Sequence, residues 1–581
     1  MKVLLISPEL QDSCYSFSKK EVRSFWFPRL SLTTLGALTP RDIEVRLVDE
    51  GVEKIDFDMD VDLVGISAMP FLAPRAYEIS DRFRKRGVKV VLGGIHPTAL
   101  PEEAKEHADT VVIGEAEKIW PSLLEDFKKG ELKPFYKMDT LPSLEGLPPQ
   151  RLSLLRPGAY MTNNCLQASR GCPYGCDFCS VTTFFGNTFR LRPVKDVIDE
   201  IAALDGKFVV FVDDNIAGNK AYARELFKAL IPLKKQWGSQ ASITLARDPE
   251  LLELAAKSGC TSLFVGIESI SQETLASANK SFNKVTDYEE SIKRFHDNGI
   301  LVNAGMIFGF DNDDESVFER TVDFLKKNRV GLVLFSILTP FPGTGFYKKL
   351  EQEGRIIDKD WSHYDGRNVV FKPKNLSPAA LQDGFHWAYH KFYSVPSILQ
   401  RVLPTKQLRI PRLYFNWAYR RMVKRVPKGE ISPLSSILNR LQGKLPAVET
   451  KNLIPNTLHT IKEKVGDMSG QIESFLEIRV KKNERLQAIL VELEGTLDKF
   501  NANELKKRIL STAKKAEMDV IINFKNLKGA TPAALQVLFS EGMHLGDYLK
   551  IKLLNLCDSF TEGLGTLSPV YVRITEEDLH Y

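Results

Sequence analysis

The chain has 581 residues, more than one hydrophobic core usually holds, so we expect three or four domains. Its 79 Lys and Arg residues nearly balance 74 Asp and Glu residues, and the net charge of +5 does not indicate a nucleic-acid-binding protein. No apolar run approaches the roughly 20 residues of a membrane span, and the first apolar run is too short for a secretory signal, so we expect a cytoplasmic protein of the α/β class.

Short apolar runs alternate with amphipathic segments through residues 1–135. This rhythm predicts a Rossmann-like domain with a doubly wound parallel sheet. No G-x-G-x-x-G follows the first run, which disfavours a nicotinamide or flavin site. The expected strands are Val3–Ile6, Ile43–Val48, Leu63–Ile66, Val88–Leu92 and Thr110–Ile113, and one helix is expected at Ala76–Lys85.

Small and polar residues follow four of these strands, at the edge where such sheets bind ligands. They are Asp49, Glu50, Gly51, Ser67, Gly93, Gly94, His96, Gly114 and Glu115. The order of these elements resembles the cobalamin-binding domain, which implies that these residues contact cobalamin and that the glycines let the backbone approach the corrin ring. A Rossmann-like domain without a cofactor is the alternative.

The D-x-H-x-x-G motif, which supplies a histidine to cobalt in methionine-synthase-like modules, is absent. We therefore expect cobalt to lack a histidine from that motif. His96 precedes a proline and has no partner visible in the sequence, so we interpret it as a loop residue at the corrin or domain edge rather than as a ligand.

The segment Arg170–Cys179 contains cysteines in a C-x₃-C-x₂-C spacing. They are Cys172, Cys176 and Cys179. Three thiolates on one loop can hold three irons of a four-iron, four-sulfur (4Fe-4S) cluster, and the fourth iron is then open to a non-protein ligand.

Zinc and disulfides are the alternatives for these cysteines. A zinc site needs a fourth ligand at a regular spacing, but the next Cys and His downstream are Cys260 and His296, and Cys165 lies on an expected strand. The odd total of seven cysteines disfavours a disulfide framework. We therefore favour the iron–sulfur interpretation.

The cysteine spacing resembles that of the radical S-adenosylmethionine (SAM) superfamily. The resemblance implies that the open iron binds the amino and carboxylate groups of SAM. An electron from the cluster then cleaves SAM to a 5′-deoxyadenosyl radical. It also implies that Phe178, just before the last cysteine, packs near the adenine.

Residues 155–345, which follow a Pro- and Leu-rich linker at Leu141–Pro149, again alternate between strand and helix patterns. The pattern predicts a partial (β/α)6 barrel of TIM type, with active residues at the carboxyl ends of its strands. The expected strands are Leu166–Arg170, Phe208–Val212, Ser242–Ala246, Ser262–Gly266, Asn303–Phe308 and Leu332–Leu338. Helices are expected at Val194–Leu204, Tyr222–Leu233, Tyr288–Asn298 and Glu315–Lys326.

Polar residues end three successive barrel strands. They are Asp213, Asp214 and Asn215, then Arg247, then Glu268. Carboxylates accept hydrogen bonds from an ammonium group, and an arginine can bind a carboxylate with two donors. The resemblance implies that Asp213–Asn215 lie near the amino group of SAM, Arg247 near its carboxylate and Glu268 near its ribose. For each residue taken alone, a solvated strand end is the alternative.

Residues 346–445 are expected to form a helical, basic extension of the barrel. Three motifs, at Leu338–Thr344, Tyr364–Gly366 and Phe392–Ser394, resemble the branch that contains anaerobic magnesium-protoporphyrin cyclase and the hopanoid methylases. His386 and His390 lie four apart on an expected helix, and we interpret them as packing at the substrate cavity rather than as a metal pair.

Residues 401–445 carry eleven Lys and Arg residues and one acidic residue, Glu430, among several aromatic residues. A basic amphipathic segment of this kind can lie on an anionic membrane, and the membrane interpretation would favour a lipid or polyprenoid substrate. A solvated helical face that covers the barrel is equally compatible with the pattern.

Residues 446–482 read as a polar linker, and the strand–helix rhythm returns in residues 483–581. Gly495–Asp498 resembles the STAS domain of anti-sigma antagonists, but Lys528–Thr531 replaces the usual phosphorylatable Asp-Ser turn. The pattern therefore predicts a docking or regulatory module without a phosphoswitch. Its expected strands are Ala488–Leu493, Val520–Phe524, Ile551–Leu556 and Val570–Ile574, and its expected helices are Asn503–Lys515 and Ala533–Phe539.

The leading functional hypothesis is a cobalamin-dependent radical methylase that acts on an unactivated carbon of a lipid, polyprenoid or other secondary metabolite. The radical would abstract hydrogen, methylcobalamin would deliver the methyl group, and a second SAM would remethylate cobalt. A donor such as flavodoxin or ferredoxin would supply electrons. The first alternative is radical cyclisation, oxidation or carbon–carbon coupling of a lipid or tetrapyrrole, and the second is a non-catalytic scaffold.

Overall fold

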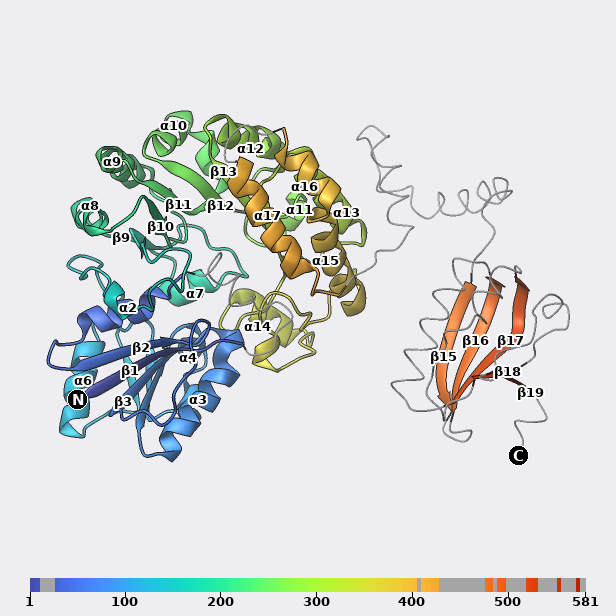
Figure 1. The fold of residues 1–581 in the computed structure, drawn as a ribbon, viewed down its shortest axis with the longest axis horizontal. Coiled ribbons are helices and arrows are strands. Elements are labelled where there is room, and N and C mark those ends of the chain that lie inside the picture. Colours follow the sequence, from blue (N-terminus) through green and yellow to red (C-terminus); the bar gives the residue numbers. More distant parts are fainter. Residues whose placement is uncertain are drawn as a thin grey trace. The chain divides into compact units, whose positions relative to one another are not determined.

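The computed structural model describes residues 1–10, 27–404 and 409–427, together with five strands between residues 476 and 574. The chain divides into two compact units, Met1–Leu445 and Pro446–Tyr581 (Figure 1). The helices expected at Asn503–Lys515 and Ala533–Phe539 lie outside the described residues.

The first unit begins with a parallel six-stranded sheet in the order β2-β1-β3-β4-β5-β6. Its strands are β1 (Lys2–Ser7), β2 (Glu44–Asp49), β3 (Leu63–Ser67), β4 (Lys89–Gly93), β5 (Thr110–Ile113) and β6 (Phe135–Lys137). The strands expected from the sequence are confirmed, and β6 is an addition at the sheet edge. This is a doubly wound order, and its direction reverses beside β1.

Helices cover both faces of this sheet because its strands are apolar on both sides. Leu4 and Ile6 of β1 pack in one core with α3 (Ala73–Lys85), whereas Val3 and Leu5 pack in the other core with α2 (Leu30–Leu38) and α6 (Trp120–Lys129). Successive side chains of a strand point to opposite faces, so one apolar run serves two cores. Two short helices, α4 (Ile95–Ala99) and α5 (Pro101–His107), follow β4.

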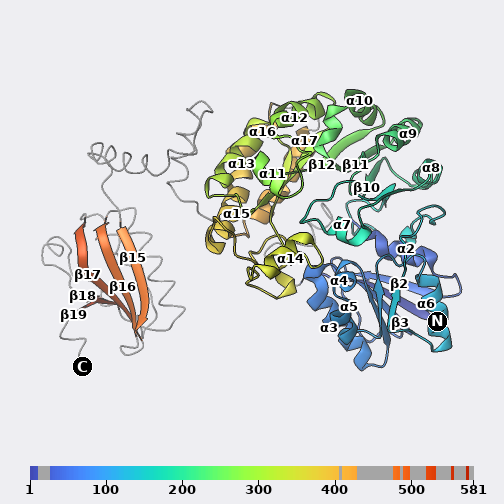
Figure 2. The ribbon, with the colours of Figure 1, turned by 180° about the vertical axis from the view of Figure 1, so that it is seen from behind.

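A second parallel sheet has the order β14-β13-β12-β11-β10-β7, so neighbours along the chain are neighbours in space. Its strands are β7 (Cys165–Leu166), β10 (Phe208–Phe211), β11 (Gln236–Ala241), β12 (Cys260–Glu268), β13 (Leu301–Phe308) and β14 (Leu332–Ile337). The helices between them lie on its outer side (Figures 1 and 2). They are α8 (Val194–Ala203), α9 (Lys220–Leu230), α10 (Pro249–Lys257), α12 (Tyr288–Asp297) and α13 (Ser316–Lys327). The short helix α11 (Gln272–Ser277) follows β12, and Ser277 lines a cavity with Phe178. The predicted partial barrel is confirmed.

One expected barrel strand is wrong in position. The chain pairs with its neighbours over Gln236–Ala241, and Ile243–Arg247 forms a 3-10 helix capped by the hydroxyl of Ser242. The paired segment is polar in sequence, with Gly and Ser at its centre, whereas the apolar residues that suggested a strand are buried in the turn.

A short antiparallel pair, β8 (Ser169–Gly171) and β9 (Phe189–Leu191), brackets the cysteine loop and α7 (Ser180–Phe185). The described part of the extension includes the helices α14 (Gly345–Gln352), α15 (Pro378–Phe392), α16 (Val395–Val402) and α17 (Arg409–Val423). It is tied to β14 by the Tyr393 hydroxyl, which donates to the carbonyl of Val333 at 2.8 Å.

The second unit contains one sheet in the order β15-β16-β17-β18-β19, with β15 antiparallel to the rest. Its strands are β15 (Leu476–Asn483), β16 (Ala488–Leu497), β17 (Asp519–Ala530), β18 (Ile551–Leu554) and β19 (Tyr571–Ile574). β15 begins inside the segment expected to be a linker. The STAS resemblance and the docking role stay predictions. Among the described residues, no helix has both the length and the apolarity needed to cross a membrane.

Candidate active site at the cysteine loop

The cysteine loop leaves β8 through Gly171, whose φ is +87°. A Cβ at this position would stand 2.2 Å from the carbonyl oxygen of Thr188, so a side chain does not fit here. The loop is then held by the Asn279 amide, which donates to the carbonyl of Gly175 at 2.7 Å, and by the Phe346 N–H, which donates to the carbonyl of Asp177 at 3.0 Å. The loop is therefore fixed both by the barrel and by the first helix of the extension.

The three loop cysteines carry free thiols that are buried or half-buried. Burial raises the pKa of each thiol, to about 12 for Cys176. Donors partly oppose this shift: Cys172 is hydrogen-bonded by the Asn215 side chain and a backbone N–H, and Cys179 by two backbone N–H groups. N–H groups directed at sulfur suit thiolates that bind iron, so the residues fit a cluster.

Within the described part of the chain, no three His, Cys, Asp or Glu side chains converge as ligands of one metal ion. A four-iron cluster makes no such demand, because each thiolate binds a different iron.

Asp213 and Asp214 anchor the entry to this loop. The carboxylate of Asp213 is completely buried and accepts hydrogen bonds from the N–H of Ala168 and from the N–H and hydroxyl of Ser169. Burial raises the pKa of Asp213 to about 7. Asp214 accepts from the N–H of Gly171 at 3.2 Å. These carboxylates therefore position the strand before Cys172, and a SAM contact for this segment stays a prediction.

Glu268 ends β12 beside a cation that the sequence analysis missed. The Lys280 ammonium lies 2.7 Å from Glu268 Oε1, and both side chains are only 12% exposed. Its positive charge also acts on the Cys176 and Cys179 sulfurs. Lys280 follows α11 in a polar segment with no strand-end signal. The sequence offered one clue, because a buried glutamate such as Glu268 needs a cation as its partner.

Arg247 is engaged elsewhere. Its guanidinium pairs with Asp287 at 3.1 Å and donates to the carbonyl of Phe282 at 3.0 Å, and the side chain is about one third exposed. The contact of Arg247 with the SAM carboxylate stays a prediction.

Phe178 lines a cavity of about 690 Å³ at the carboxyl end of β13. It packs edge-to-face against Phe310, with 6.0 Å between the ring centroids. Phe310 stands in a turn whose N–H groups donate to the buried carboxylate of Asp313. The sequence analysis missed Phe310, although a glycine directly after an apolar strand, here Gly309, marked the turn.

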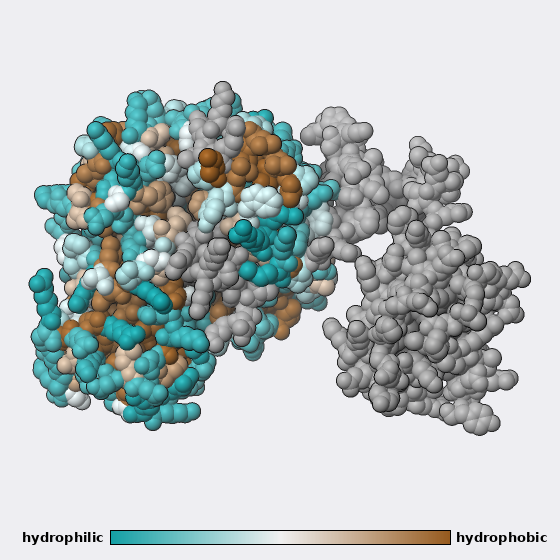
Figure 3. Space-filling view, viewed as in Figure 1, coloured by the Kyte–Doolittle hydropathy of each residue, from teal (hydrophilic) through white to brown (hydrophobic). Residues whose placement is uncertain are grey.

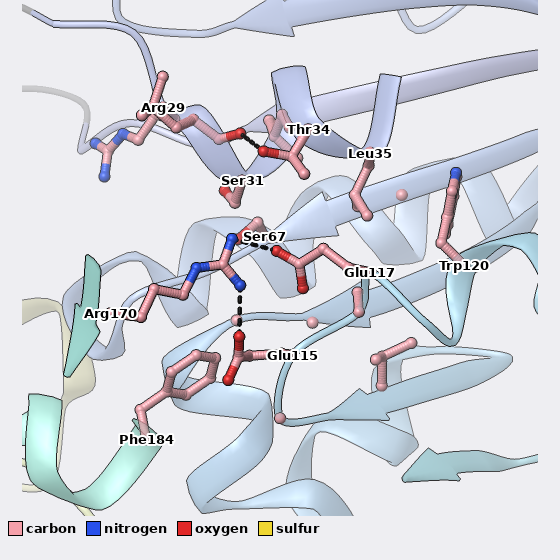
Figure 4. A pocket seen from close by; sticks show the side chains of 18 of the residues that line it. Arg29, Ser31, Thr34, Leu35, Ser67, Glu115, Glu117, Trp120, Arg170 and Phe184 are labelled. Atoms are coloured by element: carbon pink, nitrogen blue, oxygen red, sulfur yellow. Dashed lines mark hydrogen bonds and ion pairs between the residues drawn. The ribbon is translucent and has the colours of Figure 1, made fainter. Parts of the chain in front are cut away.

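A second cavity, of about 310 Å³, lies at the carboxyl ends of β3, β4 and β5 (Figure 4). Five of the predicted cobalamin contacts line it, namely Ser67, Gly93, Gly94, Gly114 and Glu115. Val91, Val112 and Trp120 give it an apolar wall that suits a flat ring. Gly114 has a φ of +85°, and no atom lies within 4 Å of the place where its Cβ would stand. The cavity therefore fits the close approach of a large ligand to the backbone.

The barrel completes this cavity with Gln167, Arg170 and Phe184. Arg170 comes two residues before Cys172, so the cavity and the cysteine loop share a wall. None of the described residues that line the cavity is a histidine.

Four predicted cobalamin contacts are not among the residues that line the cavity. Asp49 accepts from the Tyr160 hydroxyl at 3.1 Å and from the N–H of Gly51, and Glu50 pairs with Arg75. Gly51 and His96 are the other two predicted contacts that do not line the cavity.

His96 was expected in a loop at the corrin or domain edge, and the structure instead places it in a helix at the domain edge, with polar partners that the sequence did not show. His96 is buried in α4, and its Nε2 lies 2.9 Å from the Tyr77 hydroxyl and 3.1 Å from Glu103 Oε1. The indole N–H of Trp361 donates to the other oxygen of Glu103 at 3.2 Å. His96 therefore belongs to a polar network that joins the first domain to the extension.

Comparison with known proteins agrees with this geometry. Residues 166–325 match the radical SAM superfamily, and residues 36–124 match the B12 binding domain. A bacteriochlorophyllide d C-12(1)-methyltransferase of Chlorobaculum tepidum is 34% identical over 385 residues, which span 64% of this chain and 84% of that protein. A hopanoid C-2 methylase of Rhodopseudomonas palustris is 26% identical over 381 residues, which span 62% of this chain and 72% of that protein.

A solved structure shares the fold. It is the radical SAM methyltransferase TsrM from Kitasatospora setae with cobalamin and a [4Fe-4S] cluster bound. The likeness has a TM-score of 0.52 at 18% identity and covers 73% of this chain and 99% of that one.

The chain belongs to the radical SAM superfamily, in the branch that carries a B12-binding domain ahead of the barrel. It is accordingly a cobalamin-dependent radical SAM methyltransferase whose cofactors are a 4Fe-4S cluster, SAM and cobalamin. The sequence-based expectations for the family, the reaction and the cofactors are confirmed.

Proposed function

We propose that the enzyme methylates an unactivated carbon of a large, apolar polycyclic metabolite that partitions into membranes. The observation that carries this proposal is that Arg170 and Phe184, which flank the cysteine loop in the chain, line the cobalamin cavity. The relatives support the substrate class, since their names specify a tetrapyrrole and a hopanoid.

When bound, the cluster supplies the electron that cleaves SAM, and cobalamin supplies the transferable methyl group. Cys172, Cys176 and Cys179 hold the cluster. Lys280 is better placed than Arg247 to bind the carboxylate of SAM, because the adjacent Asn279 donates to the carbonyl of Gly175 in the cysteine loop, whereas Arg247 pairs with Asp287. Glu268 is left for the ribose, and the rings of Phe178 and Phe310 for the adenine.

Water must be kept from such a site while the radical exists, because side reactions with solvent would quench the radical. Two features of the structure serve this need. Cys176 is 9% exposed, and the shared cavity is walled by apolar and aromatic side chains.

The extension supports delivery of the substrate from a membrane. Exposed apolar side chains gather over α16 and α17 (Figure 3), and these are Leu399, Leu403, Ile410, Tyr414 and Trp417. Ile410, Tyr414 and Trp417 recur at helical spacing, so they lie on one face of α17. Arg421 and Lys424 are exposed at the carboxyl end of the same helix. An apolar face with cations beside it suits an anionic bilayer surface.

The test uses protein reconstituted anaerobically with iron, sulfide and hydroxocobalamin, with reduced flavodoxin or ferredoxin as the proposed electron donor. SAM is added with either bacteriochlorophyllide d or a hopanoid, and the products are quantified. We expect a methylated product with equal amounts of S-adenosylhomocysteine and 5′-deoxyadenosine, and no turnover in Cys176→Ala. An altered substrate with 5′-deoxyadenosine but no S-adenosylhomocysteine would instead assign cyclisation, oxidation or coupling.

A further inference from the structure

Four charged side chains meet where the cobalamin-binding domain contacts the barrel. Arg170 and Arg190 come from β8 and β9, whereas Glu115 and Glu117 come from the segment after β5. We name them the interdomain charge cluster. The guanidinium of Arg170 lies between the two carboxylates (Figure 4).

The contacts of the cluster are closely fitted. Arg170 donates to Glu115 and, at 2.5 Å, to Glu117 Oε1, while its Nε donates to Gln167 Oε1 at 3.1 Å. Arg190 binds the other oxygen of Glu115 and also the carbonyl of Pro142 at 2.7 Å. The Arg170 side chain is 9% exposed and that of Glu115 only 2%.

Two cations and two anions balance the charge of this cluster, so each buried charge has an opposite partner. A buried ionic network of this kind is rigid, because removing one member leaves another charge without a partner in a low-dielectric site. The residues on either side of the domain contact therefore move together.

The cluster also touches both cofactor sites. Glu115, Glu117 and Arg170 line the cobalamin cavity, and Glu115 directly follows Gly114 at the cavity edge. On the other side, Arg170 is followed by Gly171, whose N–H is held by Asp214, and then by Cys172. Arg170 thus links the edge of the cobalamin cavity to the cysteine loop through its ion pairs with Glu115 and Glu117 and through the backbone that leads to Cys172.

We propose that Arg170 is a positioning residue that couples the two cofactor sites, so that an assembled iron–sulfur cluster strengthens the binding of cobalamin. By thermodynamic linkage, cobalamin then stabilises the assembled loop by the same factor. The inference rests on the cluster and cobalamin sites described above, and it assigns the coupling to the interdomain charge cluster.

The test measures the affinity for hydroxocobalamin by absorbance titration, in protein with the cluster reconstituted and in protein stripped by a chelator. We expect the parent protein to bind about 10-fold more tightly when the cluster is present, within the range usual for coupled sites. In Arg170→Lys, which keeps the charge but loses the two-pronged contact, we expect the ratio to fall below about 2-fold.

Two further variants keep the test decisive. Glu117→Gln preserves shape while it removes one charge, and it should also lower the ratio, which covers the case in which Arg170→Lys does not fold. Arg224→Lys is the control, because Arg224 binds both oxygens of Asp248 at 2.9 Å, and this ion pair lies within the barrel and does not line the cobalamin cavity. It should keep the parent ratio.

Equal affinities with and without the cluster in the parent protein would overturn the coupling. If both Arg170→Lys and Glu117→Gln keep the parent ratio of affinities, the coupling is not carried by the interdomain charge cluster. Failure of every form to bind hydroxocobalamin would contradict the cobalamin site itself, and the inference would fall with it.

Discussion

Replacement of Lys280 by methionine tests whether the buried ion pair beside the cysteine loop is required for stability. The side chain keeps its length but loses the charge that pairs with Glu268 at 2.7 Å. Because both groups are 12% exposed, solvent screens the pair little. Removing one partner of a buried pair leaves the other charge without compensation, which costs about 3–5 kcal/mol.

The double variant Lys280→Met, Glu268→Gln isolates the cause. With no charge left in the site, most of the loss should be recovered, and the double variant should lie within about 1.5 kcal/mol of the parent. The first compact unit is large, Met1–Leu445, and its entropy of unfolding is correspondingly large, so a loss of about 3 kcal/mol corresponds to a fall in Tm of about 3 °C.

The assay is thermal unfolding of the cluster-free protein without SAM, because bound ligands would add their own stabilisation. Lys280→Met should unfold below the parent protein, and the double variant should unfold near it. The reasoning fails if the double variant is as unstable as Lys280→Met, since the loss would then come from packing rather than from an unpaired charge.

Three further outcomes are expected. Gly114→Ala should weaken hydroxocobalamin binding by about 5-fold or more, because its methyl group enters the cavity. Gly87 also has a positive φ and open space around its Cβ position, so Gly87→Ala should lower stability by about 1–2 kcal/mol, as Gly114→Ala should. Gly87→Ala should leave the affinity for hydroxocobalamin unchanged. Ile410, which is 81% exposed on α17, should contribute to membrane binding, so Ile410→Ser should reduce co-sedimentation with anionic vesicles. Ile357→Ser is the control, because Ile357 is also exposed, at 55%, but lies outside α17, and it should not reduce co-sedimentation. Equal binding by both variants would contradict a membrane contact through α17. Burial lowers the pKa of His296 to about 4, so this neutral histidine contributes stability above pH 6.5 that is lost as pH falls toward 4, by up to about 1.4 kcal/mol per pH unit. The fall in Tm between pH 7 and pH 5 should therefore be smaller in His296→Leu, and an identical fall would exclude His296 as the titrating group.

Local patterns were sufficient where one strand or one loop carries the signal. The apolar runs at Val3–Ile6 and Leu63–Ile66 predicted β1 and β3, because parallel strands buried on both faces are apolar throughout. The strand at Gln236–Ala241 was misplaced, since small polar residues there pair in the sheet while the apolar signal came from the following turn.

Polar contacts between separate elements could not be predicted from such local patterns. The partners of His96, Tyr77 and Glu103, lie 19 and 7 residues away but on other helices, and no periodic pattern connects them. Trp361 reaches Glu103 across 258 residues of sequence. Lys280 could not be connected with the cysteine loop for the same reason.

The sequence by itself determined the alternation of strands and helices and the three-thiol loop, because period and spacing are local properties of a chain. Only the tertiary structure decided that Arg170 and Glu115, 55 residues apart, share the wall between the two cofactor sites. The segment after β5 must first pack against the β8–β9 pair before these opposite charges can meet, and no local pattern contains that contact.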